Sequence, residues 1–171
     1  MESPERSFTI SVDTREQKPY SFNSVQNPVL PFNVVREALP TGDYGTRRPI
    51  VADRSWKELT QEDYRHCAMI ERKTLEDFYK TLANTRDRFE QAVLRMEMFG
   101  YAAIVIEANL GEILSPNQAL MRHAKFHAKS AIASLIAWQQ RHKIFVWTCD
   151  SRELAERLTH RLLERWIRDC E

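Results

Sequence analysis

A continuous run of apolar residues, Ala102-Ala103-Ile104-Val105-Ile106, constrains the fold of this chain more than any other feature. The run follows Gly100, a residue suited to ending the helix predicted before it. Apolar residues at every position, rather than at alternate positions, predict a strand that is buried on both faces. We therefore expect Tyr101–Glu107 to be a central strand in a sheet that helices cover on both sides.

Several other segments have the residue pattern of strands. Phe8, Ile10 and Val12 alternate with polar residues and lead into a charged cluster at 13–16. Further strands are predicted at 32–39, at 44–52 with charged interruptions, at 67–71 and at 144–148.

Helical spacing of apolar residues predicts four helices. The first follows Thr74 as its N-cap, the second covers 89–99, and the third covers 128–142. The last is expected to begin at Asp150, with Glu153 completing a capping box. Its buried stripe is predicted to be Leu154, Leu158, Leu162 and Trp166. Strands and helices in this order predict an α/β fold with a mixed central sheet flanked by helices.

The remaining segments are predicted to be irregular. We expect a flexible N-terminus at 1–7, a loop at 17–31 because of its Pro, Asn and Ser content, and a surface insertion at 53–66, which is polar and charged. At 171 residues with 43% hydrophobic content, the chain has the size of one domain, which we place at 8–171.

The overall charge does not indicate a binding partner, but the charge of one segment does. The formal net charge is +1, so overall charge does not indicate a polyanionic ligand. Between Ile113 and Cys149, however, there is no Asp or Glu and there are several basic residues. Lys125 and Lys129, with His123 and His127, are candidates for phosphate contacts. An ordinary solvated helix face would give the same pattern, and the two histidines lack the further ligands of a zinc site.

The cysteines and the lack of long apolar runs suggest a compartment. Cys67, Cys149 and Cys170 are odd in number, widely spaced and without a CxxC motif, which favours reduced thiols. No apolar run reaches the roughly 18 residues of a membrane span, and the N-terminus does not resemble a signal peptide. We expect an intracellular protein without membrane contact, in the cytoplasm or nucleoid if prokaryotic or viral and in the nucleus if eukaryotic.

The segment Glu71-Arg72-Lys73 carries the clearest chemistry. Side chains alternate along a strand, so Glu71 and Lys73 are expected to point to one face and Arg72 to the other. Mg²⁺ prefers oxygen ligands and uses only one or two protein carboxylates, which makes Asp43 and Glu71 the natural pair. Lys73 would polarise the attacking water or stabilise charge on a phosphate. For Arg72 two roles stay open, a surface salt bridge to Asp77 or Glu76 and a part in catalysis.

These residues resemble the nuclease domain of the XPF/Hef family of structure-specific DNA endonucleases, a branch of the restriction-like PD-(D/E)XK nucleases. The family pattern is Gly-Asp-x(n)-Glu-Arg-Lys-x3-Asp, and this chain has Gly42-Asp43, Glu71-Arg72-Lys73 and Asp77. Val12-Asp13-Thr14-Arg15-Glu16 and Arg88-Phe89-Glu90-Gln91 are also similar to family segments. The resemblance covers about 8–166.

The resemblance implies a restriction-endonuclease-like fold and a metal-dependent endonuclease that cleaves DNA at branches, flaps or junctions. It implies Mg²⁺ as cofactor, with Mn²⁺ able to substitute. Metal ligands would be Asp43, Glu71 and Asp13, and Lys73 would be the catalytic lysine. Arg72 and Glu16 would complete the catalytic group, and Asp77 would support the metal indirectly. DNA contacts are expected at Arg15, Arg88 and Gln91.

Several alternatives stay open. Asp53 or Asp63 would replace Asp43 as a ligand if the insertion shifts the register. We expect no helix-hairpin-helix module after the last helix, so duplex binding would come from this domain, from a second copy in a homodimer, or from a partner protein. A Holliday-junction resolvase and a less selective nuclease fit the same residues. A non-catalytic DNA-binding or scaffold subunit with the same fold is the alternative of a different class.

Overall fold

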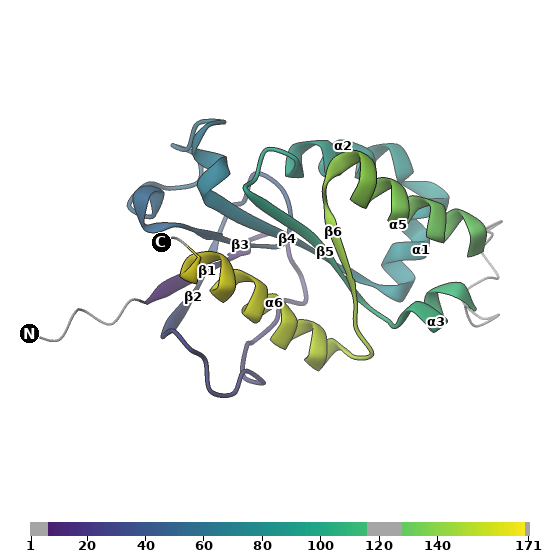
Figure 1. The fold of residues 1–171 in the computed structure, drawn as a ribbon, viewed down its shortest axis with the longest axis horizontal. Coiled ribbons are helices and arrows are strands. Elements are labelled where there is room, and N and C mark those ends of the chain that lie inside the picture. The colour runs from purple at the N-terminus through teal and green to yellow at the C-terminus, as the bar shows by residue number, and fades with distance from the viewer. Residues whose placement is uncertain (1–6, 116–127, 170–171) are drawn as a thin grey trace, which may run out of the picture.

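A computed structural model describes residues 7–115 and 128–169, and its centre is a six-stranded sheet (Figure 1). The strand order is β2-β1-β3-β4-β5-β6. β3 is antiparallel to β1 and to β4, whereas the remaining pairs are parallel, so the predicted mixed sheet is confirmed. The strands are β1 Phe8–Asp13, β2 Phe32–Glu37, β3 Tyr44–Arg47, β4 Cys67–Thr74, β5 Tyr101–Glu107 and β6 Phe145–Thr148.

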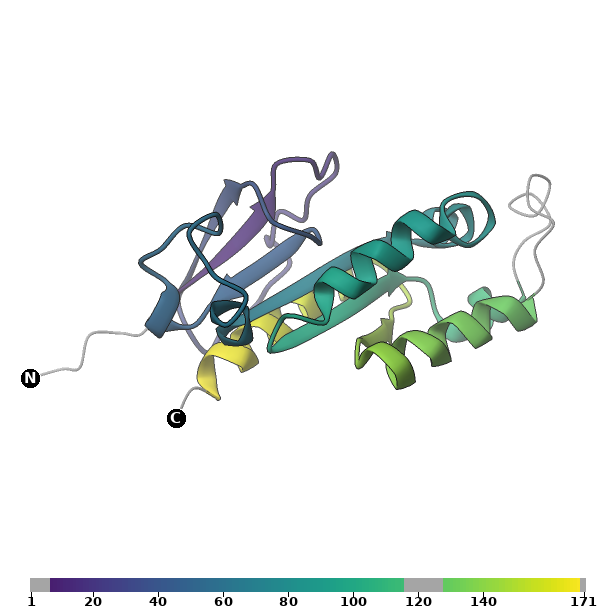
Figure 2. The same ribbon diagram turned by 90° about the horizontal axis from the view of Figure 1, so that it is seen from above.

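The described helices cover both faces of this sheet. α1 and α2 lie on one side and α6 on the other (Figures 1 and 2). No helix among the described residues is long and apolar enough to cross a membrane. The helices are α1 Leu75–Asn84, α2 Arg86–Met96, α3 Leu110–Leu114, α5 Ala128–His142 and α6 Arg152–Arg168.

The central apolar strand lies where its sequence predicts. β5 pairs with β4 and β6, and its side chains alternate between two hydrophobic cores. Ile104 and Ile106 pack with α1, α2 and α5, while Ala103 and Val105 pack with α6. A strand that contributes to both cores needs apolar residues at every position, which accounts for the unbroken run.

β4 leads directly into α1, and this junction positions the predicted chemistry. The strand extends to Thr74, three residues beyond its predicted end, so the whole Glu71-Arg72-Lys73 segment is extended. The hydroxyl of Thr74 accepts a hydrogen bond from the backbone N–H of Asp77, which confirms the predicted N-cap. Glu76 and Asp77 in the first turn add favourable interactions with the helix dipole.

Two predictions for the segment between β3 and β4 are wrong in detail. β3 ends at Arg47 rather than near residue 52, because Pro49 begins a short 3₁₀ helix, Pro49–Val51. The segment 53–66 is also more than a surface insertion. The indole of Trp56, 2% exposed, donates hydrogen bonds to Ser11 and Glu37, and Leu59 is buried too.

The last helix differs from its prediction in its cap and in its buried face. Ser151, rather than Asp150, is the N-cap and accepts a hydrogen bond from the N–H of Leu154. Leu154 is 45% exposed, and the buried face instead includes Ala155, Leu163 and Ile167. Three residues of the predicted stripe are only partly buried, at the edge of the hydrophobic core between α6 and the sheet, namely Leu158, Leu162 and Trp166. The short helix α3, which begins with a capping box at Asn109 and Glu112, was not predicted.

Candidate active site

Asp43 directly precedes β3 and lies between the end of β1 and the middle of β4. Its backbone N–H donates to Ile70, and its carbonyl accepts from the N–H of Asp13. Gly42 before it has φ of +70°, and a Cβ there would lie 2.8 Å from the side chain of Met69. Only glycine combines that backbone conformation with so close an approach, which accounts for the Gly-Asp order.

Glu71 and Lys73 point to the same face of β4, as predicted. The Lys73 ammonium lies 2.9 Å from the Glu71 carboxylate, and it also lies over the ring of Phe89, 4.4 Å from the ring centre. The aromatic face attracts the cation, so Lys73 is held from two sides near the carboxylate. Glu71 and Lys73 are both mostly buried, with side chains 14% exposed.

Arg72 points to the opposite face of the strand, which confirms the predicted alternation. Of the two roles left open for Arg72, the salt bridge to Asp77 or Glu76 is not formed. The guanidinium pairs with Glu107 at 2.6 Å and lies 3.5 Å from Glu16. The backbone N–H of Arg72 nevertheless contributes to the face that carries Glu71 and Lys73, because it donates to Oδ2 of Asp43 at 2.7 Å.

The acids facing the cleft repel one another. Burial, followed by the charge of Glu71, raises the pKa of Asp43 well above its ordinary value, and Arg72 and Lys73 offset only part of this effect. A divalent cation would relieve both the burial penalty and the repulsion. Carboxylate oxygens suit the hard cations Mg²⁺ and Mn²⁺, so the donor chemistry of Asp43 and Glu71 fits the predicted ion.

Asp13 lines the same cleft as these two acids, but its carboxylate is already bound within its own turn, so its role as a third metal ligand stays a prediction. Its carboxylate accepts hydrogen bonds from the backbone and guanidinium of Arg15 and from the N–H of Leu39. Burial raises the pKa of Asp13, but these hydrogen bonds outweigh burial and hold it below its ordinary value. Across 7–115 and 128–169, no cluster of three Asp, Glu, His or Cys residues is arranged to hold a metal. Asp13 instead anchors the turn after β1.

Glu16 and Asp77 both line the cleft, each with a local partner. Glu16 accepts a hydrogen bond from the N–H of Lys18 at 2.7 Å in addition to its ion pair with Arg72. Asp77 accepts one from the Thr74 hydroxyl at 2.8 Å. The clearest role of Asp77 is therefore at the start of α1, and indirect support of a metal stays a prediction.

A cleft of about 940 Å³ opens over these residues. One wall is the segment 13–18 after β1, and the other consists of α1 and α2. Both walls carry basic side chains and also acids, namely Asp13 and Glu16 on one wall and Glu76 and Asp77 on the other. Asp43 and Glu71 lie on the floor. The basic residues that line the cleft are Arg15, Lys18, Arg72, Lys73, Lys80, Arg88 and Arg95, and the guanidinium of Arg72 pairs with Glu107.

The predicted DNA contacts divide between this cleft and other surfaces. Arg15 and Arg88 line the cleft, whereas Gln91 and Lys129 are exposed outside it. Lys125 and the two histidines beside it lie outside the described residues. The alternative ligands Asp53 and Asp63 are also outside the cleft, and Asp63 is bound by Arg54 at 2.7 Å.

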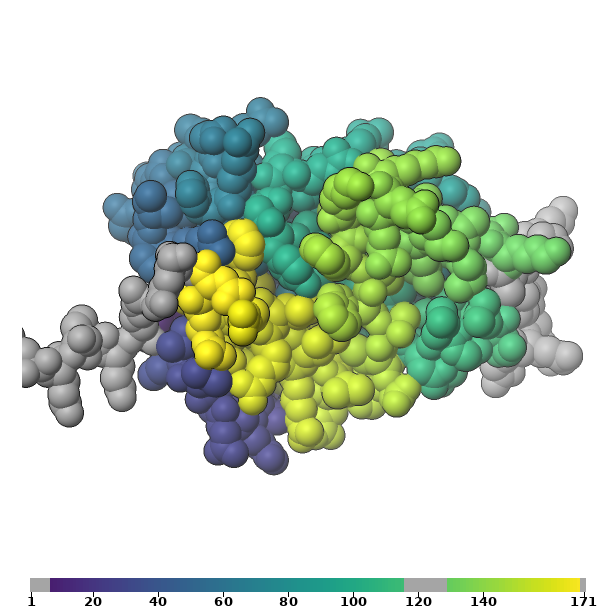
Figure 3. Space-filling view, viewed as in Figure 1, coloured from purple at the N-terminus to yellow at the C-terminus, as the bar shows by residue number. Residues whose placement is uncertain are grey.

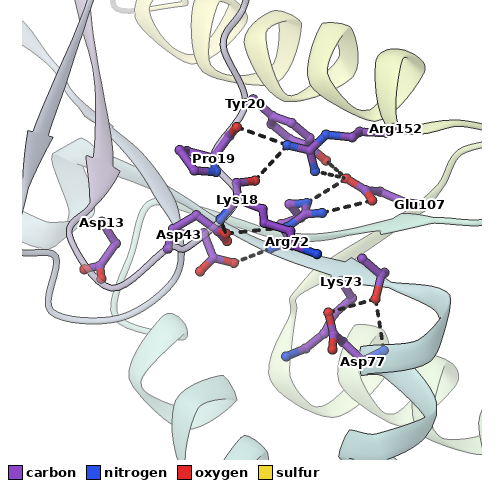
Figure 4. A network of polar contacts seen from close by, with 12 residues as sticks. Asp13, Lys18, Pro19, Tyr20, Asp43, Arg72, Lys73, Asp77, Glu107 and Arg152 are labelled. Atoms are coloured by element: carbon purple, nitrogen blue, oxygen red, sulfur yellow. Dashed lines mark hydrogen bonds and ion pairs between the residues drawn. The ribbon is translucent and has the colours of Figure 1, made fainter.

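Sequence reasoning missed a polar network behind β4. Glu107, the last residue of β5, accepts hydrogen bonds from Arg72, Tyr20 and Arg152 (Figure 4). These residues come from four separate segments. The one available signal was the acid that closes the apolar run, since a carboxylate at the end of a buried strand requires a partner.

Comparison with known proteins agrees with this arrangement. A family model described as the ERCC4 domain matches residues 12–162. XPF from Aeropyrum pernix is similar in structure, with a TM-score of 0.59 and 20% identity, covering 91% of this chain and 65% of that chain. XPF from Aeropyrum pernix in complex with DNA gives a TM-score of 0.59 and 20% identity, covering 94% and 64%. No curated protein matches significantly.

The chain thus spans just under two thirds of the length of these solved structures. At this identity the likeness establishes the fold, and it confirms the α/β nuclease-domain architecture expected from the sequence. The family model covers most of the chain and includes every residue of the Gly-Asp and Glu-Arg-Lys motifs. This chain therefore belongs to the ERCC4-domain family of XPF/Hef-type nucleases.

Proposed function

We propose that this chain is a divalent-metal-dependent endonuclease that hydrolyses phosphodiester bonds in DNA. The observation that carries the proposal is that Asp43, Glu71 and Lys73 lie together on the floor of a cleft whose walls include several arginines and lysines. Asp43 and Glu71 would hold Mg²⁺, or Mn²⁺ in its place. When bound, such an ion neutralises charge on the phosphate and activates water.

The chain's own residues perform the remaining tasks. Lys73, held beside Glu71, is positioned to orient the attacking water or to stabilise charge on the phosphate. Arg15 and Lys18 on one wall and Arg88 on the other line the cleft, and in this proposal they would contact backbone phosphates on either side of the reacting group. Arg72 holds Asp43 through its backbone N–H.

We propose branched, flap or junction DNA as the preferred substrate. The support is membership of the ERCC4-domain family and the likeness to XPF from Aeropyrum pernix, which has been solved in complex with DNA. Basic side chains on both walls, among them Arg15 and Arg88, would also hold a strand at both sides of the cut. A second copy or a partner protein would supply further contact with the duplex.

A homodimer would use the exposed apolar surface of β6 and α6. Phe145 and Trp147 on β6 are 52% and 41% exposed, and Leu154 on α6 is 45% exposed. β6 and α6 lie next to each other on the same side of the molecule (Figure 3). Trp138, by contrast, belongs to the core. A monodisperse monomer at high concentration would reject this assembly.

The first test of the proposed function is cleavage of labelled flap, fork, four-way-junction, duplex and single-stranded DNA with Mg²⁺ or Mn²⁺. Asp43→Asn should abolish cutting, and Lys73→Ala should slow it by about 10²–10³-fold. Asp87→Asn and Lys57→Ala serve as controls, because both residues are exposed and lie outside the cleft. Each control should cut at the wild-type rate.

The alternative is a non-catalytic DNA-binding or scaffold subunit with the same fold. In that case the wild type would bind DNA without cutting any substrate in either metal. Cutting that persists in Asp43→Asn would equally contradict the proposed site.

A further inference from the structure

Glu107 is the centre of a buried ion network on the face of β4 that points away from the cleft. Its side chain is 9% exposed and that of Arg72 is 8% exposed. Arg72 donates to both carboxylate oxygens, at 2.6 and 3.1 Å. The Tyr20 hydroxyl donates at 2.9 Å and Arg152 at 3.2 Å. Charge-assisted, two-pronged contacts of this kind are among the strongest hydrogen bonds in proteins.

The charges of this network are balanced. Two arginines, Arg72 and Arg152, face two acids, Glu107 and Glu16. Burial and the charge of Glu107 raise the pKa of Tyr20, so its hydroxyl stays protonated and continues to donate. Removal of Glu107 would leave two guanidinium groups with one remaining, more distant acid. The geometry of Arg72 therefore depends on Glu107.

Arg72 links this network to the floor of the cleft. The same residue that pairs with Glu107 through its side chain donates its backbone N–H to Asp43. Tyr20 provides a second link, because its ring stacks on Tyr44, with centres 5.0 Å apart, and its N–H donates to the Tyr44 hydroxyl. Tyr44 directly follows Asp43. A displacement of Arg72 or of Tyr20 would therefore also move the carboxylate of Asp43.

Arg152, the first residue of α6, links the network to the wall of the cleft. One guanidinium nitrogen donates to the carbonyls of Lys18 and Pro19, at 2.7 and 3.0 Å. These carbonyls belong to the segment that presents Glu16 and Lys18 to the cleft. Figure 4 shows Arg152 reaching from α6 to this segment, with Glu107 directly below.

We propose that Glu107 is a positioning residue for the reaction: through Arg72 and Tyr20 it sets the Asp43 carboxylate, and with Arg152 it sets the wall segment that carries Glu16 and Lys18. Glu107 itself does not line the cleft. This inference rests on the proposed function, and its test includes metal binding as a readout independent of cleavage.

The test compares Glu107→Gln with Glu164→Gln. Glu164 is a matched control because it is an equally buried acid, with a side chain 2% exposed. It also accepts hydrogen bonds from an arginine and from loop backbone, namely Arg161, Val29 and Leu30, but it does not line the cleft. Each folded protein is titrated with Mn²⁺ by calorimetry, and kcat and KM for DNA cleavage are measured separately.

Glu107→Gln is expected to weaken Mn²⁺ binding and lower kcat, each by about 10- to 100-fold, the usual cost of losing a residue that orients a ligand. Glu164→Gln should lose thermal stability while its Mn²⁺ affinity and kcat stay within about twofold of wild type. Equal losses in the two variants, or wild-type Mn²⁺ affinity and kcat in Glu107→Gln, would overturn the inference.

If Glu107→Gln does not fold, Arg152→Ala decides, because that side chain is 43% exposed and its removal leaves the Arg72 pair intact. It should lower kcat by about tenfold, with faster amide exchange at 16–20. Wild-type kcat and exchange would overturn the inference.

A wild type that binds Mn²⁺ without cutting would refute the proposed function alone, and the Mn²⁺ titrations would still test the role of Glu107. A wild type that does neither would overturn both.

Discussion

Neighbouring residues of β4 point to opposite faces of the strand. The two faces differ in how far their buried charges are neutralised. On the cleft face, Lys73 and Arg15 lie near Asp43 and Glu71, yet the pKa of Asp43 is raised. On the other face, Arg72 meets Glu107 in a balanced, two-pronged pair. One face is electrostatically satisfied, while the other keeps an excess of negative charge.

One face of β4 therefore stabilises the fold, whereas the other face is suited to binding a ligand. A satisfied pair adds rigidity, but it offers nothing to a cation. Clustered carboxylates cost stability in the free protein, and this cost is recovered when a cation binds. The strand thus places a rigid support directly behind the groups that need accurate placement.

The largest expected effect on stability comes from removing the ion pair between Arg72 and Glu107. Arg72→Met should reduce the free energy of unfolding by about 3–5 kcal/mol, because Glu107 is left buried without its main partner. Lys73→Met, the matched change on the cleft face, should cost about 1 kcal/mol, since Glu71 borders a solvent-filled cleft. Urea unfolding of both variants measures the difference. Equal losses would show that the two faces are not distinct.

A smaller effect of opposite sign is expected on the cleft face. The pKa of Asp43 is higher in the folded than in the unfolded chain, so stability is greatest when Asp43 is protonated and falls as the pH rises through the folded pKa. Asp43→Asn should therefore stabilise the protein at pH 7 by about 1 kcal/mol, or roughly 2–4 °C in Tm. The gain should vanish below about pH 4, where the carboxyl is protonated in both states.

Thermal unfolding from pH 3 to pH 8 measures this effect. Asp87→Asn is the control, since Asp87 is exposed and outside the cleft, and it should change stability by less than about 0.5 kcal/mol at any pH. Saturating Mg²⁺ should raise the Tm of the wild type and leave that of Asp43→Asn unchanged. A stability loss in Asp43→Asn at pH 7 would contradict the assigned repulsion.

The smallest expected effect concerns the walls. Arg88→Ala should weaken DNA binding with little dependence on sequence and reduce the slope of log K against log salt by about 1. Gln91→Ala, three residues further along α2 and outside the cleft, should leave the slope unchanged. Fluorescence anisotropy at several salt concentrations distinguishes them. An unchanged slope for Arg88→Ala would exclude it from the path of the DNA.

Local patterns in the sequence were sufficient for much of the fold and for part of the site. The unbroken apolar run predicts β5, and Thr74 with Asp77 predicts the start of α1, because both signals depend on residues a few positions apart. The alternation along β4 likewise predicts that Glu71 and Lys73 share a face. Where a competing local signal existed, as with Asp150 and Ser151 at the start of α6, the choice between neighbours was wrong.

The partners of the charged residues were decided by the tertiary structure alone. Asp13 is bound by Arg15 and Leu39, and Arg72 selects Glu107, 35 positions away, over the nearby Asp77 and Glu76. Tyr20 reaches the same acid across 87 positions. The physical reason is that strand and helix periods follow from the backbone over one or two turns, whereas the pairing of buried charges depends on which distant segments pack together. The sequence by itself determined the elements and the faces of β4, and folding determined which charges are neutralised and which remain for a ligand.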